Sequence, residues 1–231
     1  MIPLRDDNPT RRFPIVTIVL ILLNVAVFAY EHSLSPEALQ AFFSKWAFVA
    51  SSFTTEPTSI HQLATVFAAM FMHAGWVHIG GNMLYLWIFG NNVEDRLGRL
   101  PFLAFYLACG TAGVAAQAFV SPGSSIPTLG ASGAIAGVLG AYALLFPRAS
   151  VLTLIPIFFF FEIARVPAFI VIGFWFVLQL ASGVASIDPT LAQAGGIAYF
   201  SHIGGFAVGL ALVLPLWLSS RFARRTRGGR Y

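Results

Sequence analysis

Residues 129–146 read LGASGAIAGVLGAYALLF, a run without a charged side chain in which Ser132 stands among glycine, alanine and aliphatic residues. Ser132, Ala136 and Gly140 recur at helical spacing on one face. Small residues at such a spacing let transmembrane helices approach each other closely. The apolar part, residues 131–146, is slightly shorter than the roughly 17–25 residues that usually cross a bilayer. We therefore expect a short membrane helix that packs tightly against a neighbour and carries a serine near its first turn.

The rest of the chain has the composition of an integral membrane protein. Of its 231 residues, 58% are hydrophobic and 10% are charged, whereas about a quarter of an ordinary globular domain is charged. Apolar runs of spanning length occur at 14–30, 75–93, 101–120, 166–183 and 197–218. The first run also has features of a signal peptide, but it exceeds the usual length of such a core, so we expect a retained helix. With residues 131–146 included, the sequence predicts an all-α, polytopic bundle of six transmembrane helices.

The cationic residues predict the orientation of this bundle, because short loops rich in Lys and Arg stay in the cytoplasm. With six spans, one side of the membrane holds all of the arginines and the other holds only Lys45. The arginines are Arg5, Arg11, Arg12, Arg96, Arg99, Arg148, Arg165, Arg221, Arg224, Arg225, Arg227 and Arg230. Both termini are therefore expected in the cytoplasm, in a multi-pass protein of the cell membrane, and specifically of a bacterial inner membrane.

This topology divides the chain into a cytoplasmic tail (1–13), a membrane core (14–218) and a basic cytoplasmic tail (219–231). The net charge of +4 agrees with the topology and with contact to anionic lipid. It does not indicate nucleic-acid binding, because basic patches interleaved with aromatic residues are missing. The sequence does not define an oligomeric state.

Three connecting segments also carry expectations. In the first outer loop (31–73), Ser35 followed by Pro36 is a helix-start signal, and the helix that follows should lie flat in the membrane interface. The segment 151–161 is apolar but too short to span, so we expect a connection that stays close to the membrane. The loop 184–196 contains Asp-Pro and Gly-Gly pairs and should be mobile.

Polar side chains inside the predicted spans are candidates for function, because they are costly in a bilayer. They are His78, Asn82, Gln117, Ser132, Gln179 and His202, and no Asp or Glu lies within a span. At 1.5 Å per residue, Ser132, His202 and His78 lie about 21, 24 and 22 Å above the cytoplasmic ends of their helices. The three therefore share one layer, roughly 6–9 Å below the outer surface of a ~30 Å core. Gln117 and Gln179 are expected to form hydrogen bonds between helices.

The residue types in this layer are suited to nucleophilic catalysis. A serine hydroxyl becomes reactive when a neighbouring imidazole takes its proton, and His202 lies on a small-residue face with Gly205 and Gly209. Because the spans contain no carboxylate, the expected arrangement is a Ser132–His202 dyad without the third member of a triad. His78, Asn82 and the backbone N–H of Ser132 are candidate donors to a tetrahedral oxyanion. Zinc proteolysis is not indicated, because no H-E-x-x-H motif is present.

Other interpretations of the same residues stay open at this point. Ser132 on its own would more often be a packing residue, and a single membrane histidine more often a structural hydrogen-bonding group. One alternative class is a catalytically silent protein that binds or escorts membrane helices. Another is a small transporter that uses His78 and His202 as a proton or metal relay, although the sequence has no internal repeat.

Three motifs, taken together, resemble the rhomboid family of intramembrane serine proteases. They are residues 73–83 (HAGWVHIGGNM), residues 130–133 (GASG) and residues 201–206 (SHIGGF), which match in order the family's motifs on its second, fourth and sixth helices. The resemblance covers roughly residues 14–218. It implies that Ser132 is the nucleophile, that His202 is the general base, and that His78, Asn82 and the Ser132 backbone form the oxyanion site.

The resemblance also implies partners and a route to the site. Substrates would be transmembrane proteins that enter sideways beside the aromatic-rich fifth helix, under a cap formed by residues 184–196, and no cofactor or metal is expected. In two respects this sequence departs from the family pattern. The Trp-Arg pair common in the first loop is not recognisable near residues 60–62. Several relatives carry an aromatic residue one turn after the nucleophile, where this chain has Ala136, so the sequence does not define which residue orients His202.

Overall fold

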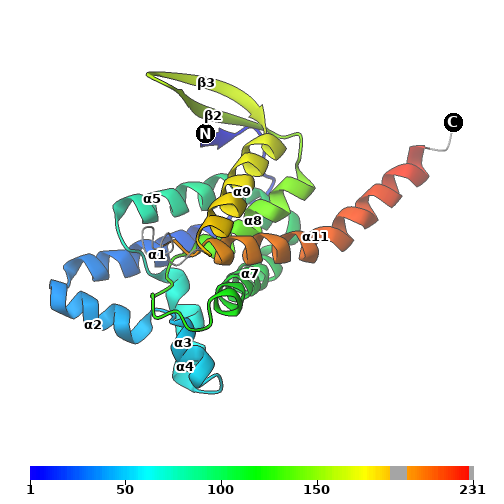
Figure 1. Cartoon of the computed structure of the whole chain (residues 1–231). Helices are drawn as coiled ribbons and strands as arrows, with labels where there is room; N and C mark the ends of the chain where they lie inside the picture. Colours follow the sequence, from blue (N-terminus) through cyan, green and yellow to red (C-terminus); the bar gives the residue numbers. More distant parts are fainter. Residues whose placement is uncertain (188–196, 229–231) are drawn as a thin grey trace.

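The computed structural model describes the backbone of residues 1–187 and 197–228, and side chains up to residue 219. Helices dominate, and three strands form one small sheet (Figure 1). The elements are β1 (Ile2–Asp6), α1 (Ile15–Ser33), α2 (Pro36–Trp46), α3 (Ala50–Thr55), α4 (Ile60–Ala68), η1 (Ala69–Phe71), α5 (Trp76–Tyr85), η2 (Leu86–Gly90), α6 (Asn91–Leu97), α7 (Arg99–Val120), α8 (Ser132–Leu145), β2 (Ser150–Ile157), β3 (Phe160–Pro167), α9 (Ala168–Ala185) and α11 (Tyr199–Gly228).

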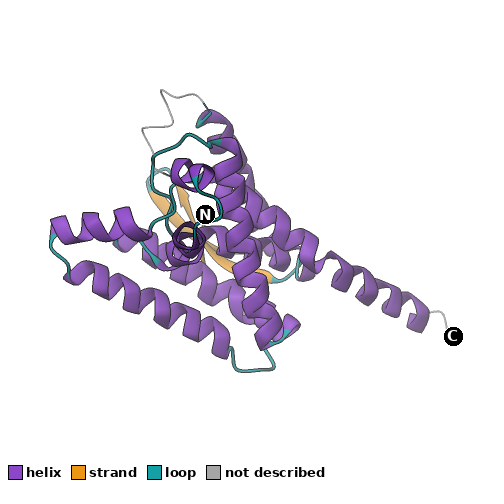
Figure 2. Cartoon of the chain, turned by 90° about the horizontal axis from the view of Figure 1, so that it is seen from below, coloured by secondary structure: helices purple, strands orange, loops and turns teal. Residues whose placement is uncertain are grey.

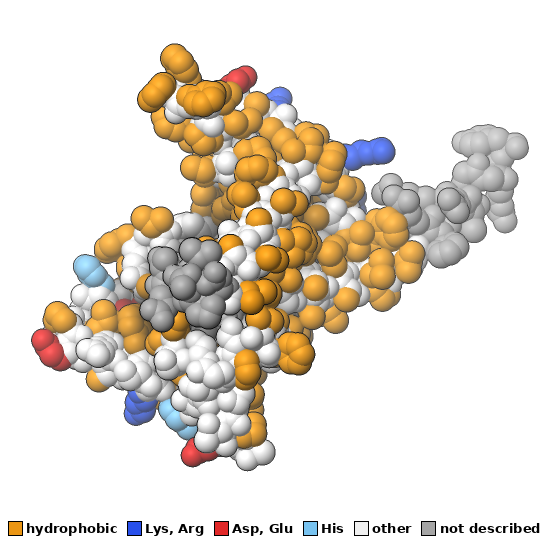
Figure 3. Space-filling view, in the orientation of Figure 1, with side chains coloured by type: hydrophobic (Ala, Val, Ile, Leu, Met, Phe, Trp, Pro, Cys, Tyr) orange, Lys and Arg blue, Asp and Glu red, His pale blue; other side chains and the backbone are white. Residues whose placement is uncertain are grey.

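The predicted apolar runs all form helices. Within the described residues, four helices are long and apolar enough to cross a membrane, namely α1, α7, α9 and the first 21 residues of α11. Residues Ile60–Phe71 and Trp76–Leu97 add a further candidate, as a pair of apolar helical segments bent by 82°. The helix α8 is apolar but shorter, as its sequence predicts. The chain is therefore a polytopic helical membrane protein, and Figure 3 shows hydrophobic side chains over much of the face in view.

The short helix α8 lies at the centre of the bundle. Residues Gly133–Tyr142 are all buried, because α7, α9 and α11 pack around them. Glycines set how closely α8 and α11 approach. A methyl group on Gly205 would overlap the carbonyl of Gly133, and one on Gly209 would overlap the backbone of Gly137. The close approach predicted from the small-residue faces is therefore confirmed.

The predicted helix in the first outer loop is also confirmed. It is α2, which begins after Ser35, whose side-chain oxygen accepts a hydrogen bond from the backbone N–H of Ala38 at 3.3 Å. The helices α1 and α2 form a hairpin (Figures 1 and 2), and the rings of Tyr30 and Phe42 meet edge to face with centroids 5.5 Å apart. Most of the predicted mobile loop, residues 188–196, lies outside the described residues.

The expectation of an all-α chain is wrong at one end of the bundle. Residues 151–161, expected as a connection close to the membrane, belong to an antiparallel β-hairpin formed by β2 and β3. The strand β1 pairs with β2 to give the order β1-β2-β3. Figure 1 places this sheet at one end of the bundle, and in Figure 2, seen from below, it lies behind the helices. The cause is backbone hydrogen bonding, since a connection that leaves the helices needs partners for its N–H and C=O groups, and the N-terminal segment supplies them.

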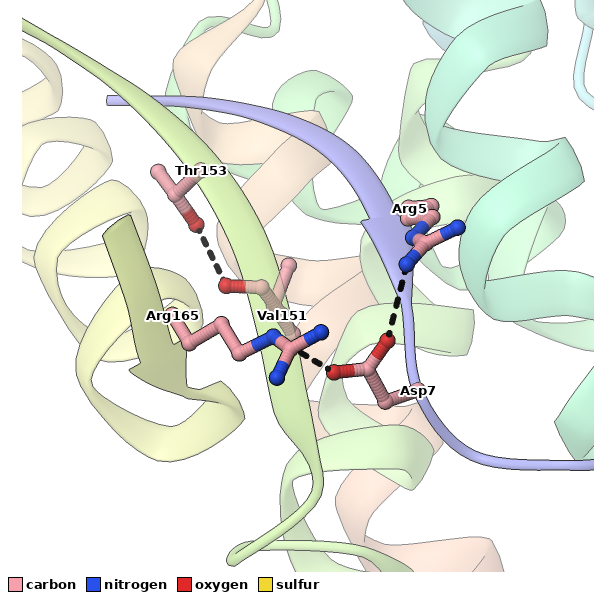
Figure 4. A network of polar contacts seen from close by, with 5 residues as sticks. All are labelled: Arg5, Asp7, Val151, Thr153 and Arg165. Atoms are coloured by element: carbon pink, nitrogen blue, oxygen red, sulfur yellow. Dashed lines mark hydrogen bonds and ion pairs between the residues drawn. The ribbon is translucent and has the colours of Figure 1, made fainter. Parts of the chain in front are cut away.

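Polar contacts connect this sheet to the helices and join the end of β1 to β3. Asp6 Oδ2 accepts hydrogen bonds from the Tyr142 hydroxyl at 2.6 Å and from Asn92 Nδ2 at 3.0 Å. Burial raises the pKa of Asp6, although the hydrogen bond from Tyr142 lowers it. The carboxylate of Asp7 lies 3.2 Å from Arg165 Nε, which links the end of β1 to β3 (Figure 4). The predicted N-terminal tail therefore contains a folded strand.

Candidate active site

A cavity of about 840 Å³ contains the polar residues that the sequence places in one layer. Ser132, His202, His78 and Asn82 all line it, together with Gln179. They come from four separate helices, α5, α8, α9 and α11. The common depth inferred from helix counting is therefore matched by a common cavity.

Ser132 and His202 meet directly in this cavity. The distance from His202 Nε2 to Ser132 Oγ is 2.8 Å, a normal hydrogen-bond length. Ser132 is the first residue of α8, and His202 lies in the first turn of α11. A serine side chain is short, so the contact depends on the glycine-mediated approach of α8 and α11. The two residues that the sequence pairs are thus in position to exchange a proton.

The turn before Ser132 is shaped by Gly130. Its φ of +121° lies in a region that other residues rarely adopt, and its N–H donates to the carbonyl of Ala69 at 2.8 Å. A methyl group at this position would lie 2.7 Å from His78 Nε2 and 3.7 Å from Asn82 Nδ2. A glycine is therefore required, and both candidate oxyanion donors face this turn.

The hydrogen bonds of His78 and Asn82 leave a proton on each for a ligand. His78 Nδ1 accepts from the backbone N–H of Ala74 at 3.4 Å, which puts the ring proton on Nε2, the atom that faces Gly130. Asn82 Nδ2 lies 3.0 Å from His73 Nε2. One amide hydrogen binds His73, and the second remains available. Together with the free N–H groups at the start of α8, these hydrogens make a corner of the cavity that is rich in hydrogen-bond donors.

Sequence reasoning did not assign a role to the residues that support this corner. His73 is 1% exposed, and its backbone N–H donates to Glu31 Oε2 at 3.2 Å. Glu31 itself is 2% exposed although it lies near the end of α1. A chain of contacts therefore runs from α1 through Glu31 and His73 to Asn82. The only signal in the sequence was the acidic residue Glu31, and its position near the end of a helix gave no reason to expect that it is buried.

The second ring nitrogen of His202 has a partner that sequence reasoning listed only as an interhelical bonding residue. His202 Nδ1 lies 2.7 Å from Gln179 Oε1 on α9. Trp175, one turn earlier on the same helix, lies near the same imidazole, with ring centroids 5.9 Å apart. The expected interhelical bond of Gln179 is thus confirmed. The parallel expectation fails for Gln117 Oε1, which is buried without a hydrogen-bond partner in the described part of the chain.

The fold and the cavity define a class of protein, a polytopic helical membrane protein that holds a Ser–His pair between its helices. Comparison with known proteins gives the family. The model of the rhomboid domain matches residues 60–219, which is more than half of the chain. The chain therefore belongs to the rhomboid family, as its three motifs indicate.

Relatives occur in mitochondria, chloroplasts and bacteria. Rhomboid protein 1, mitochondrial, of Saccharomyces cerevisiae is 31% identical over 79% of this chain and 49% of its own length. Rhomboid protease GluP of Bacillus subtilis is 38% identical over 62% of this chain and 25% of its length. Rhomboid-like protein 11, chloroplastic, of Arabidopsis thaliana is 25% identical over 88% of this chain and 65% of its length. The chain thus spans about half of the yeast relative.

Proposed function

We propose that this protein is an intramembrane serine endopeptidase that uses Ser132 as nucleophile and His202 as general base. The observation that carries the proposal is the 2.8 Å contact between His202 Nε2 and Ser132 Oγ within the cavity. The Bacillus subtilis relative is named as a rhomboid protease, which supports the same activity. A packing serine would not need a base as its partner.

The chemistry follows from the atoms in contact. His202 Nε2 takes the proton of Ser132 Oγ while the oxygen attacks a peptide carbonyl, and an oxyanion forms. The protonated imidazole then gives its proton to the leaving amine, which leaves an acyl-enzyme. A water molecule, deprotonated in turn by His202, hydrolyses that ester and regenerates Ser132. The proton balance closes over the two steps, so no cofactor is required.

The oxyanion is bound, in this proposal, by the corner beside Gly130. His78 Nε2–H, the free amide hydrogen of Asn82 and the N–H of Ser132 supply up to three donors from preorganised positions. Such donors act strongly where water is limited, and loss of one costs about 100- to 1000-fold in rate. The dyad lacks a carboxylate partner, so oxyanion binding carries a larger share of the rate enhancement.

Membrane-spanning proteins are the proposed substrates. The cavity wall includes Trp175, Leu178 and Ser182 of α9, a helix with many exposed apolar side chains, so a helix in the lipid reaches the dyad by passing α9. We also propose six spans, with a membrane core at 14–218, cytoplasmic tails at 1–13 and 219–231, and cleavage near the outer face. A bacterial inner membrane stays a prediction, since the relatives come from three kinds of membrane.

Cleavage of a helical reporter in liposomes tests the function. Wild-type protein should cleave a single-span substrate and should react with a serine-directed fluorophosphonate. Ser132→Ala and His202→Ala should each abolish cleavage, because each removes one half of the dyad. Ser121→Ala, at the end of α7 and outside the cavity, is the matched control and should cleave normally. Full cleavage by both dyad variants would refute the proposal, and binding of the substrate without cleavage by the wild type would favour a silent escort.

A further inference from the structure

The imidazole of His202 has an oriented environment even though Ala136 stands one turn after Ser132. Ala136 is fully buried and cannot stack on the ring. Apart from Ser132 itself, the described side chains that contact the ring belong to α9. Gln179 Oε1 lies 2.7 Å from Nδ1, and Trp175 covers the ring from one turn away. The orientation of the base is therefore set by a helix that carries neither dyad residue.

We propose that Gln179 is the positioning residue of the dyad, a proposal that rests on the proposed protease function. An amide oxygen can only accept a hydrogen bond, so Gln179 Oε1 requires a proton on His202 Nδ1. The neutral ring then has its lone pair on Nε2, which faces the hydroxyl of Ser132. The opposite tautomer would direct an N–H at the serine and could not take its proton. Gln179 thus selects the tautomer that makes His202 a base.

The choice of a glutamine rather than a carboxylate has its own consequence. Among the described residues, no carboxylate lines the cavity, and the titratable groups there besides His202 are His78, Tyr85 and Tyr199. Gln179 therefore orients the imidazole without adding a charge that would hold a proton on it. Because Gln179 and Trp175 share α9, a displacement of α9 would remove both contacts with the ring at once.

The decisive experiment compares three glutamine substitutions in liposomes. Gln179→Met keeps the length of the side chain but removes the acceptor, and should lower kcat about 100-fold, the size of effect expected when a catalytic group is misplaced by about 1 Å, with KM unchanged. Gln179→Glu keeps an acceptor and should restore most of the rate at high pH. Its negative charge stabilises the imidazolium, so the acid limb of its pH–rate profile should move to higher pH. Gln117→Met, on α7 and outside the cavity, makes the same chemical change and should behave like the wild type.

Fluorophosphonate labelling separates positioning from substrate docking, because the probe is small and needs only an activated serine. The labelling rate of Gln179→Met should fall in proportion to kcat. Wild-type rates of labelling and cleavage in Gln179→Met would overturn this inference, as would equal losses in the Met and Glu variants without a shift in pH profile. Those results would leave the dyad intact. Cleavage that survives Ser132→Ala would instead overturn the proposed function itself.

A second feature is the tip of the β2–β3 hairpin, where four consecutive phenylalanines are exposed and no contact within the described residues accounts for them. Phe158 and Phe159 form the turn and are 97% and 94% exposed, and Phe160 and Phe161 are 77% and 72% exposed. Phe158 has a φ of +51°, a conformation that favours Asn or Gly in such turns. The local geometry therefore does not explain the aromatic residues, which Figure 3 shows as a hydrophobic group away from the bundle.

We infer that this tip inserts into the interface of the membrane that α8 and α9 cross. The hairpin is rooted at the ends of those two helices, since the N–H groups of Ala168 and Phe169 donate to Ala149 and Pro147. From that root it extends sideways rather than along the axis of α9 (Figure 1). A sideways hairpin that starts at the ends of membrane helices brings its tip to the lipid interface, where aromatic side chains are favoured.

A fluorescent label placed at the tip tests the insertion. Phe158→Cys in a Cys109→Ala background carries bimane, and the protein is reconstituted in vesicles of phosphatidylcholine with brominated acyl chains. Strong quenching by the bromine atoms and protection from aqueous iodide are expected. Both effects should be lost when Phe159→Ser, Phe160→Ser and Phe161→Ser are combined with the labelled variant. Iodide access without bromolipid quenching in the original variant would overturn the inference, as would protection that depends on protein density, which would indicate contact with a second copy.

Discussion

The cavity at the first residue of α8 and the sheet beyond its last residue are built on different principles. In the cavity, every polar group that sequence reasoning selected finds a partner or faces the same space, because polar atoms in a membrane protein are costly without one. In the sheet, the contacts are mostly between backbone atoms, and the tip carries bare apolar side chains. Polar atoms inside the membrane need specific hydrogen-bond partners and therefore restrict one another's positions. Apolar residues at the membrane edge are compatible with several backbone conformations.

The largest effect is expected at the oxyanion corner. Asn82→Ala removes a donor that faces Gly130 and also the partner of His73 Nε2. We expect kcat to fall about 100- to 1000-fold with little change in KM, because the donor acts on charge that forms during the reaction. The measurement is the steady-state cleavage of the helical reporter in liposomes.

A second variant shows whether the loss is catalytic rather than structural. Asn82→Asp is similar in shape but presents no donor when ionised, so it should be as slow as the alanine variant while its thermal unfolding stays close to that of the wild type. If either variant cleaved at more than a tenth of the wild-type rate, Asn82 would not be an oxyanion donor.

The next effect concerns the helix contact that brings the dyad together. A methyl group at Gly209 would overlap the backbone of Gly137, so Gly209→Ala must push α8 and α11 apart. Overpacking of this kind costs about 1–3 kcal/mol. We expect a loss of that order in the free energy of unfolding in detergent, together with slower fluorophosphonate labelling of Ser132.

The chain offers a matched control for this variant. A methyl group at Gly173 of α9 would meet nothing within 4 Å, so Gly173→Ala should leave both the stability and the labelling rate unchanged. Equal effects of the two substitutions would mean that the α8–α11 distance does not control the dyad. Wild-type labelling in Gly209→Ala would mean the same.

The difference between the two regions also explains what could be predicted. The helices follow from apolar runs, and the common layer of Ser132, His202 and His78 follows from the fixed rise of a helix. The pairing of Gln179 with His202 could not be derived, because α9 is apolar on all sides and its rotation is set by packing. The hairpin was missed because its first strand, β2, is largely apolar on both faces, which hides the two-residue period of a strand. In addition, the partner strand β1 lies about 150 residues away in the sequence.

A smaller effect is expected when the hairpin is shortened. Ile155 pairs with Glu162, so residues 156–161 can be replaced by Asn-Gly, which suits a two-residue turn. We expect cleavage in detergent to stay within about twofold of the wild type, because the hairpin lies at the far end of α8 from Ser132. A twofold change in rate corresponds to a change in activation free energy smaller than RT. A tenfold loss would show that the sheet and the cavity are coupled.

The smallest effect is expected at the anchor of the sheet, where Asp6 Oδ2 accepts hydrogen bonds from Tyr142 and Asn92. Burial raises the pKa of Asp6 above its usual value of 3.8, so the folded protein binds the proton more readily than the unfolded chain does. The free energy of unfolding that Asp6 contributes is therefore highest below pH 3.8 and declines as the pH rises through the folded-state pKa. The nearby charge of Asp7 acts in the same direction.

Asp6→Asn keeps an oxygen for Tyr142 but carries no charge at any pH. It should be slightly more stable than the wild type at neutral pH, by less than ~1 kcal/mol because the site is only half-buried and partly screened, and this difference should vanish in acid. Asp6→Leu, which lacks the acceptor, should be less stable than both, because Tyr142 loses its partner. The measurement is detergent unfolding of the three proteins between pH 3 and 8. If the difference in free energy of unfolding between the wild type and Asp6→Asn did not change with pH, the charge of Asp6 would be fully solvated. The surroundings of Asp6 in the sheet would then have no effect on its protonation.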